Sequence, residues 1–165
     1  MRRAAPLNPT PEGTAWVEGA FGTPVRAFQG LAEASRVGAH LVEVEPPDTL
    51  VLRIAGDLSG GEVSWMLDVF ERLAVGPGRA YILVDLARMG HVSPEARRIS
   101  GQRQLPPAYG GLALFGGTFQ QRLVAKLATT AGWLLRGRSL GKPRPACVED
   151  ERAARAWIAE RRAGS

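Results

Sequence analysis

The apolar residues of this chain fall into short continuous runs and longer stripes with helical spacing, which alternate along most of its length. The clearest run is Tyr-Ile-Leu-Val at residues 81–84, a pattern typical of a strand that is buried on both faces of a sheet. Four large apolar side chains in succession cannot leave either face in water without a substantial cost in free energy. The pattern therefore predicts an interior strand that ends at Asp85, where we expect the chain to leave the sheet.

A helix is predicted to begin shortly after this strand. Ser93 supplies a hydroxyl that can cap a helix, Pro94 has the fixed φ that suits the first helical position, and Glu95 places an acid near the positive end of the helix dipole. The helix must end before Pro106 and Pro107. If the sheet is parallel here, the turn lies at its carboxyl edge, where open α/β sheets place their ligand crevices.

The segment before the interior strand predicts a hairpin and a helix. Strand-like runs at residues 41–44 and 50–54 flank Pro-Pro-Asp-Thr, a turn signal, so we expect two antiparallel strands. The sequence Gly-Asp-Leu-Ser-Gly-Gly at residues 56–61 is expected to break the sheet, with Ser59 as the cap of a helix. The helical apolar positions are Val63, Met66, Leu67, Val69, Phe70 and Leu73, and a Gly-Pro-Gly sequence at residues 76–78 ends the helix.

The second half of the chain repeats the strand-to-helix pattern. A strand at residues 112–115 leads through Gly116 and Gly117 to Thr118, the expected cap of a long helix that ends near residue 136. A short strand at residues 145–148 leads into a last helix, with Ala153, Ala154, Trp157 and Ile158 facing inward. The order predicts an α/β fold: a mixed, mostly parallel sheet of four to five strands with an N-terminal antiparallel hairpin and about four helices.

The first part of the chain has no sustained periodicity. Residues 1–38 are rich in glycine and proline, so we expect an N-terminal arm, either flexible or draped on the domain. Residues 39–162 are expected to form a single domain, and the length of 165 residues suits one core.

Composition excludes several kinds of site. The single cysteine, Cys147, excludes an internal disulfide and a multi-cysteine metal site and favours the reducing cytoplasm. Asp57 and Asp85 lack the further oxygen ligands that a cation needs, so we expect no metal. No apolar segment reads as a signal peptide or a bilayer span. The charge of +5 suggests nucleic acid, but scattered arginines and few aromatic residues make nucleic acid an improbable partner. We interpret the basic residues between 136 and 144 as a neutralised helix end rather than a phosphate site.

Four segments in order resemble the STAS domain superfamily, and more closely its SpoIIAA-like branch. They are G-D-L-S at residues 56–59, Y-I-L-V-D-L at 81–86, L-A-L-F-G-G at 112–117 and V-E-D-E-R-A-A-R-A-W-I at 148–158. The resemblance covers residues 39–160 and implies a SpoIIAA-like fold. In STAS anti-sigma-factor antagonists, a phosphorylatable serine begins the helix after the central strand. Ser93 is similar in place, but it lacks the D-S-S-G context, so we favour the helix cap over a phosphosite.

Catalysis is poorly supported by the residue types. The only histidines are His40, which we expect at the surface, and His91, which could activate Ser93 with Asp85 or Asp57 as its orienting acid. No G-x-S-x-G motif surrounds the serine, and no Gly-Lys-Ser/Thr follows Gly116 and Gly117. We therefore expect no enzyme and no cofactor.

Two main functional hypotheses remain, with a hydrolase as a weaker third. The first, implied by the resemblance, is a non-enzymatic regulatory domain that engages a protein partner or a small apolar or anionic ligand at a loop edge. That edge comprises Asp57, Ser59, Asp85, His91, Ser93, Gly116, Gly117 and Thr118. The second is a lipid or apolar-ligand binder, based on the wide apolar face of the helix at residues 119–136, which includes Trp133 and is followed by arginines. For that helix we favour the simpler interpretation, in which its apolar face is core or the face of a homodimer. An apolar pocket beneath it would favour the second hypothesis, and a contact between His91 and Ser93 would favour a hydrolase.

Overall fold

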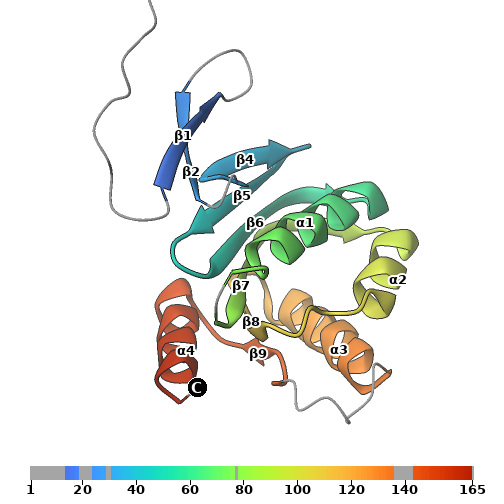
Figure 1. Cartoon of the computed structure of the whole chain (residues 1–165). Helices are drawn as coiled ribbons and strands as arrows, with labels where there is room; N and C mark the ends of the chain where they lie inside the picture. Colours follow the sequence, from blue (N-terminus) through green and yellow to red (C-terminus); the bar gives the residue numbers. More distant parts are fainter. Residues whose placement is uncertain (1–13, 19–23, 29–30, 77, 136–142, 165) are drawn as a thin grey trace, which may run out of the picture.

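The computed structural model describes residues 14–18, 24–28, 31–76, 78–135 and 143–164, and these residues form two sheets and four helices (Figure 1). A small antiparallel sheet holds β1 (Thr14–Glu18), β2 (Pro24–Phe28) and β3 (Leu31–Ala32). The main sheet has the strand order β4-β5-β6-β7-β8-β9. Its strands are β4 (Ala34–Val37), β5 (His40–Glu45), β6 (Thr49–Leu58), β7 (Ala80–Val92), β8 (Tyr109–Phe115) and β9 (Ala146–Cys147).

The main sheet confirms the predicted fold class. Strands β4, β5 and β6 pair in antiparallel fashion, whereas β6, β7, β8 and β9 are parallel. The sheet has six strands, which is more than expected, because β4 at residues 34–37 pairs with β5 as the edge strand. These residues belong to the segment that the sequence pattern assigned to an arm.

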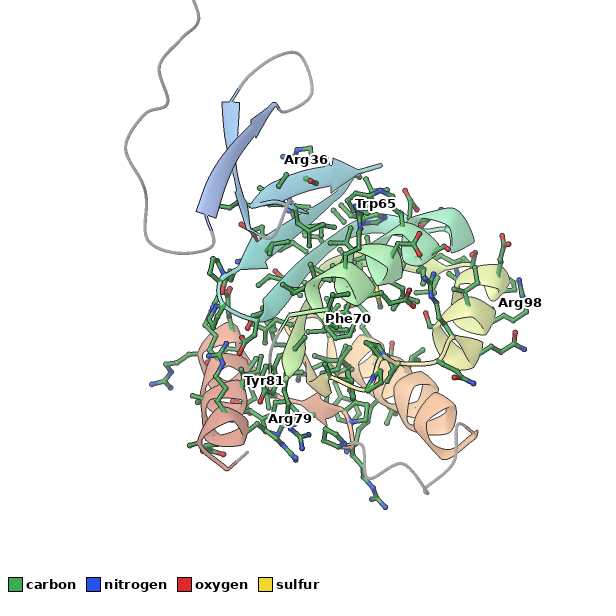
Figure 2. All side chains as sticks on the ribbon, viewed as in Figure 1. Arg36, Trp65, Phe70, Arg79, Tyr81 and Arg98 are labelled. Atoms are coloured by element: carbon green, nitrogen blue, oxygen red, sulfur yellow. The ribbon has the colours of Figure 1, made fainter. Side chains whose placement is uncertain are left out.

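Strand β7 is an interior strand, as predicted, since it lies between β6 and β8 and residues 81–84 are all buried. Alternation along the strand sends Ile82 toward one face of the sheet and Tyr81 toward the other. Helices α1 (Gly60–Leu73), α2 (Pro94–Gln102) and α3 (Phe119–Leu135) lie on the first face, and α4 (Glu151–Ala163) covers the second (Figure 1). Phe70 of α1 and Tyr81 accordingly belong to two separate core layers (Figure 2).

Two predicted strand ends were wrong. Strand β7 does not end at Asp85 but continues to Val92, and β6 does not break at Gly56 but continues to Leu58. Register shifts between Arg53 and Ala55 and between Gly56 and Leu58 let the two strands stay paired. A β-bulge absorbs an extra residue in one strand while the ladder continues beyond it. The carboxyl edge of the sheet therefore lies several residues further along the chain than the apolar pattern indicated.

The prediction of a surface position for His40 was also wrong. His40 is the first residue of β5 and is fully buried. Its Nδ1 atom accepts a hydrogen bond from the backbone N–H of Ala55 at 3.0 Å. Ala55 follows the first register shift in β6, so the imidazole satisfies an amide at an irregular point of the ladder.

The three predicted helix caps are confirmed. Ser59 at α1, Ser93 at α2 and Thr118 at α3 each accept a hydrogen bond from a backbone N–H of the first turn. Asp150, which the sequence pattern did not single out, caps α4 in the same way. In α4, Ile158 is buried and Trp157 is half-buried against the second core layer, as the apolar stripe predicted. The predicted end of the long helix, at residues 136–137, lies outside the described residues.

Arginine-carboxylate pairs fasten α4 to the sheet. Arg53 of β6 donates to Glu43 of β5 at 2.7 Å and to both carboxylate oxygens of Glu151 of α4, at 3.1 and 3.2 Å. Arg155 of α4 donates to both oxygens of Glu45, at 2.7 and 2.8 Å. The hydrogen bonds from Arg53 hold the pKa of Glu151 below its ordinary value, and those from Arg155 do the same for Glu45.

Candidate functional site

The residues predicted at the loop edge do lie near one another, but their polar groups are largely bonded within the edge itself. Asp57 of β6 accepts a hydrogen bond from the backbone N–H of His91 of β7 at 2.8 Å. Asp85 accepts one from the backbone N–H of Ala87 at 2.8 Å. Gly116 packs so closely on Asp85 that a Cβ atom there would come within 2.9 Å of its carboxylate, and its φ is +71°. The two glycines after β8 therefore form a tight structural turn.

The helix starts at this edge are closed by their own side chains. Ser59 and Glu62 form a capping box at α1. The Glu62 carboxylate accepts hydrogen bonds from the backbone N–H of Ser59 at 2.8 Å and from the Ser59 hydroxyl at 2.7 Å. These bonds lower the pKa of Glu62. At α3, the Thr118 N–H donates to the Gln121 side chain at 2.7 Å, and the Gln121 N–H donates to the Thr118 hydroxyl at 3.2 Å. An incoming anion would have to displace these side chains from the amides.

His91 and Ser93 do not form a catalytic pair. The Ser93 hydroxyl accepts a hydrogen bond from the Ala96 backbone N–H at 3.1 Å, and in the described part of the chain no hydrogen bond joins it to the His91 ring. Within that same part of the chain, no group of three or more His, Cys, Asp or Glu side chains is placed to hold a metal ion. The edge therefore shows helix capping rather than the geometry of a nucleophile and its base.

An apolar cavity of about 220 Å³ lies between the sheet and the three helices on its first face. The floor consists of inward-facing residues of β6, β7 and β8, and α1 supplies one wall. Ala125 of α3 supplies part of another wall, so the cavity lies beneath the long helix. The apolar lining residues are Leu52, Ile54, Leu58, Val63, Met66, Leu67, Ile82, Val84, Leu86, Met89, Val92, Leu105, Leu112, Leu114, Ala125 and Pro145.

Helix α2 brings polar groups to this cavity. Arg97 and Ser100 of α2 line it, and so does Arg103, which follows the helix. The buried residue of α2 is Ala96. The helix packs mainly against α1 and α3 rather than on the sheet (Figure 1). The helix therefore covers the cavity while contributing little to the apolar core.

Arg103 fastens the end of α2 to α1. Its guanidinium donates to both carboxylate oxygens of Glu71, at 2.8 and 2.9 Å, and to Asp68, with a further contact to the backbone oxygen of Ser64 at 3.3 Å. These carboxylates raise the pKa of Arg103. Arg97 is exposed, and no ion pair joins it to any residue that the structure describes. It therefore offers a cation at the rim of the apolar space.

Sequence reasoning missed most of this cavity. Its floor residues were assigned simply to strand cores, Arg97 was counted among the scattered arginines, and Arg103 was not singled out. One signal was present: the helix at residues 94–102 has few apolar positions, so it could not fill the space above the sheet. The wide apolar face of the helix that follows β8 pointed to the same region.

Replacing the cap of α2 tests the role of Ser93. We expect Ser93→Ala to lower the free energy of unfolding by about 1 kcal/mol, because the Ala96 N–H loses its acceptor. Ser93→Asp keeps an acceptor, so it should change the free energy of unfolding by only about 0.3 kcal/mol. Urea unfolding of the two variants measures this difference. A loss of the same size in both variants would contradict the capping role. If Ser93→Asp alone changes which proteins are recovered with the chain in a pull-down, Ser93 acts as a regulatory switch.

No protein-family model and no curated protein matches the chain. Its structure is similar to the crystal structure of an uncharacterized protein of the DUF3478 family with a SpoIIAA-like fold from Shewanella loihica PV-4. The two chains are 19% identical, the match covers 73% of this chain and 92% of the other, and the TM-score is 0.48.

Proposed function

We propose that this chain is a non-enzymatic binding domain that holds a small apolar ligand between its sheet and helices α1, α2 and α3. The cavity of about 220 Å³ carries this proposal, because its lining is apolar apart from a few groups contributed mainly by and near α2. Ligand sites in proteins are typically concave and apolar, with a small number of polar groups that orient the ligand. The loop edge is the less favoured site, since its amides and carboxylates are already bonded to one another.

The size and the polar rim suggest the class of ligand. The cavity is larger than the engineered space of about 150 Å³ that accepts benzene, and smaller than the roughly 300 Å³ at which drug-sized sites begin. A medium-length acyl chain or a small ring system matches that range. Arg97 at the rim favours a ligand that ends in a carboxylate or another anionic group.

The chemistry of the lining supports binding rather than catalysis. The titratable side chains of the cavity wall are those of Arg97, Arg103 and Tyr109. An arginine stays protonated at any physiological pH and cannot serve as a general base. Arg103 also forms ion pairs with Glu71 and Asp68.

Filling the cavity tests the proposal. We expect Ala125→Phe to weaken the binding of decanoic acid and of decanol at least about tenfold, because the phenyl ring would occupy the space that the ligand needs. Native mass spectrometry and displacement of a fluorescent apolar probe would measure binding. The melting temperature should stay close to that of the wild type, since the ring enters an existing void.

The matched control is Ala159→Phe, which adds the same ring at an exposed position of α4. This control should bind both probes as the wild type does. Failure of the wild type to bind either probe, or equal binding by the wild type and Ala125→Phe, would contradict the cavity as the binding site.

A further inference from the structure

The outer face of α3 exposes large apolar side chains. Phe119 is 72% exposed, Leu123 45%, Val124 56% and Leu127 61%. Phe119, Leu123 and Leu127 are spaced four residues apart, so they lie along one side of the helix. The opposite side is turned inward, because Gln121 donates to the backbone oxygen of Met89 at 2.7 Å and Ala125 lines the cavity.

Basic residues accompany this apolar face. Arg122 and Lys126 lie beside it on α3, and the helix contains no acidic residue. The whole stretch from residue 119 to residue 144 contains six basic residues and no acidic one, whereas the rest of the chain contains 15 basic and 16 acidic residues. The net charge of +5 therefore originates in this one stretch. Outside this stretch basic and acidic residues are nearly equal in number, and Arg53, Arg103 and Arg155 contact carboxylates directly.

We propose that the outer face of α3 docks on the surface of an anionic lipid bilayer. A helix that lies in a membrane interface combines large apolar side chains on one face with lysine and arginine beside them, and anionic lipids attract the cations. No helix in the described part of the chain is long and apolar enough to cross a bilayer. The contact is therefore a peripheral one, in which Phe119, Leu123 and Leu127 enter the headgroup boundary and the basic residues meet lipid phosphates.

The charge distribution argues against the other occupants of such a face. A second copy of the chain would bring its own Arg122 and Lys126 against those of the first, and like charges in close proximity repel. A single-stranded nucleic acid would bind through basic groups and several stacking aromatic rings. Of the four exposed apolar residues described on this helix, Phe119 is aromatic, and Leu123, Val124 and Leu127 are aliphatic. An anionic lipid surface satisfies both the positive charge and the exposed aliphatic groups.

This docking goes beyond the proposed ligand binding and does not require a ligand. Because α3 lines the cavity on its inner side, docking through its outer side would place the cavity directly above the bilayer surface. The same helix would then separate the binding cavity from the source of apolar molecules.

Vesicle cosedimentation of the full chain tests the inference. We expect binding to vesicles of phosphatidylcholine with about one third phosphatidylglycerol, weaker binding at high salt, and little binding to phosphatidylcholine alone. The double variant Leu123→Gln/Leu127→Gln should lose about tenfold or more in affinity for the anionic vesicles, and Arg122→Gln about fivefold. All three side chains are at least partly exposed, so the variants should fold as the wild type does.

Two controls alter the same residue types on other surfaces. Val75→Gln removes an aliphatic side chain that is 84% exposed after α1, and Arg152→Gln removes an exposed charge on α4. Both should bind the anionic vesicles as the wild type does. The inference is overturned if the wild type does not bind anionic vesicles, or if the α3 variants and the controls bind equally. It is also overturned if single-stranded DNA binds the α3 face more tightly than the vesicles do, or if the α3 variants abolish a dimer of the wild type.

Discussion

Replacement of Arg53 by methionine is expected to lower the free energy of unfolding by about 2 kcal/mol. Arg53 contacts three carboxylates, those of Glu43, Glu151 and Asp85, and it is partly buried between the sheet and α4. Exposed ion pairs contribute at most about 1 kcal/mol, and breaking a fully buried pair costs about 3 to 5 kcal/mol, so this half-buried arginine falls between the two. Methionine preserves much of the apolar part of the arginine side chain, so the decrease in unfolding free energy measures the contribution of the guanidinium group.

Arg152→Met is the matched control, because Arg152 is an exposed residue of the same helix α4. It should change the unfolding free energy by less than about 0.5 kcal/mol. Urea unfolding followed by circular dichroism compares the two variants. Similar losses for Arg53→Met and Arg152→Met would show that the arginine-carboxylate contacts do not fasten α4.

The same contacts predict an acid-dependent stability. The pKa of Glu151 is lowered mainly by hydrogen bonds from Arg53, and that of Glu45 mainly by hydrogen bonds from Arg155. A carboxyl whose pKa is lower in the folded state stabilises the fold above its ordinary pKa of 4.5 and loses this contribution as the pH falls through the lowered value. The wild type should therefore lose stability as the pH falls from about 5 to about 3, and Arg53→Met should lose less over the same interval.

Much of the fold follows from local patterns in the sequence. The run at residues 81–84 is buried on both faces, and only an interior strand between two helical layers provides such an environment. The helix starts were predictable for a different reason: Ser59, Ser93 and Thr118 each place an acceptor where a first-turn N–H needs one. Both signals act within a few residues, so they can be read without knowing the tertiary structure.

The features that sequence reasoning missed depend on pairing between distant residues. The extension of β6 and β7 requires bulges whose position is set by the register of two strands, and neither strand carries that information alone. Strand β4 is short and polar, with no apolar run, and it is held as an edge strand by its ladder with β5. From its sequence alone, this segment is therefore difficult to distinguish from a loop.

The candidate site shows the same limit. The loop edge was predicted from polar residues near strand ends, and two of them do meet there, because the His91 backbone N–H donates to the Asp57 carboxylate. The cavity, in contrast, arises because α2 spans the space above the sheet without filling it. This arrangement depends on how the sheet and the helices pack together, not on any one segment of the sequence. A ligand site made of ordinary core residues leaves no distinctive motif in the sequence.

His40 provides the second large expected effect. We expect His40→Ala to lower the free energy of unfolding by about 3 kcal/mol, because it both opens a void and removes an acceptor. His40 is fully buried, and its Nδ1 atom accepts a hydrogen bond from the N–H of Ala55, which is half-buried and would lose this acceptor. Among the described residues the Nε2 atom has no hydrogen-bond partner, although Glu62 Oε2 is 3.4 Å away, so this second nitrogen contributes less to stability.

His40→Gln and His40→Leu separate the two causes of this loss. The glutamine side chain can accept a hydrogen bond through its amide oxygen, whereas leucine fills similar space without an acceptor. If the Ala55 N–H dominates, glutamine should recover at least about 1 kcal/mol relative to alanine, and leucine should recover less. Hydrogen exchange at the Ala55 amide adds a local measurement, since this amide should exchange faster in the alanine and leucine variants. Equal stability of all three variants, with unchanged exchange at Ala55, would show that the imidazole does not hold the irregular part of β6 in place.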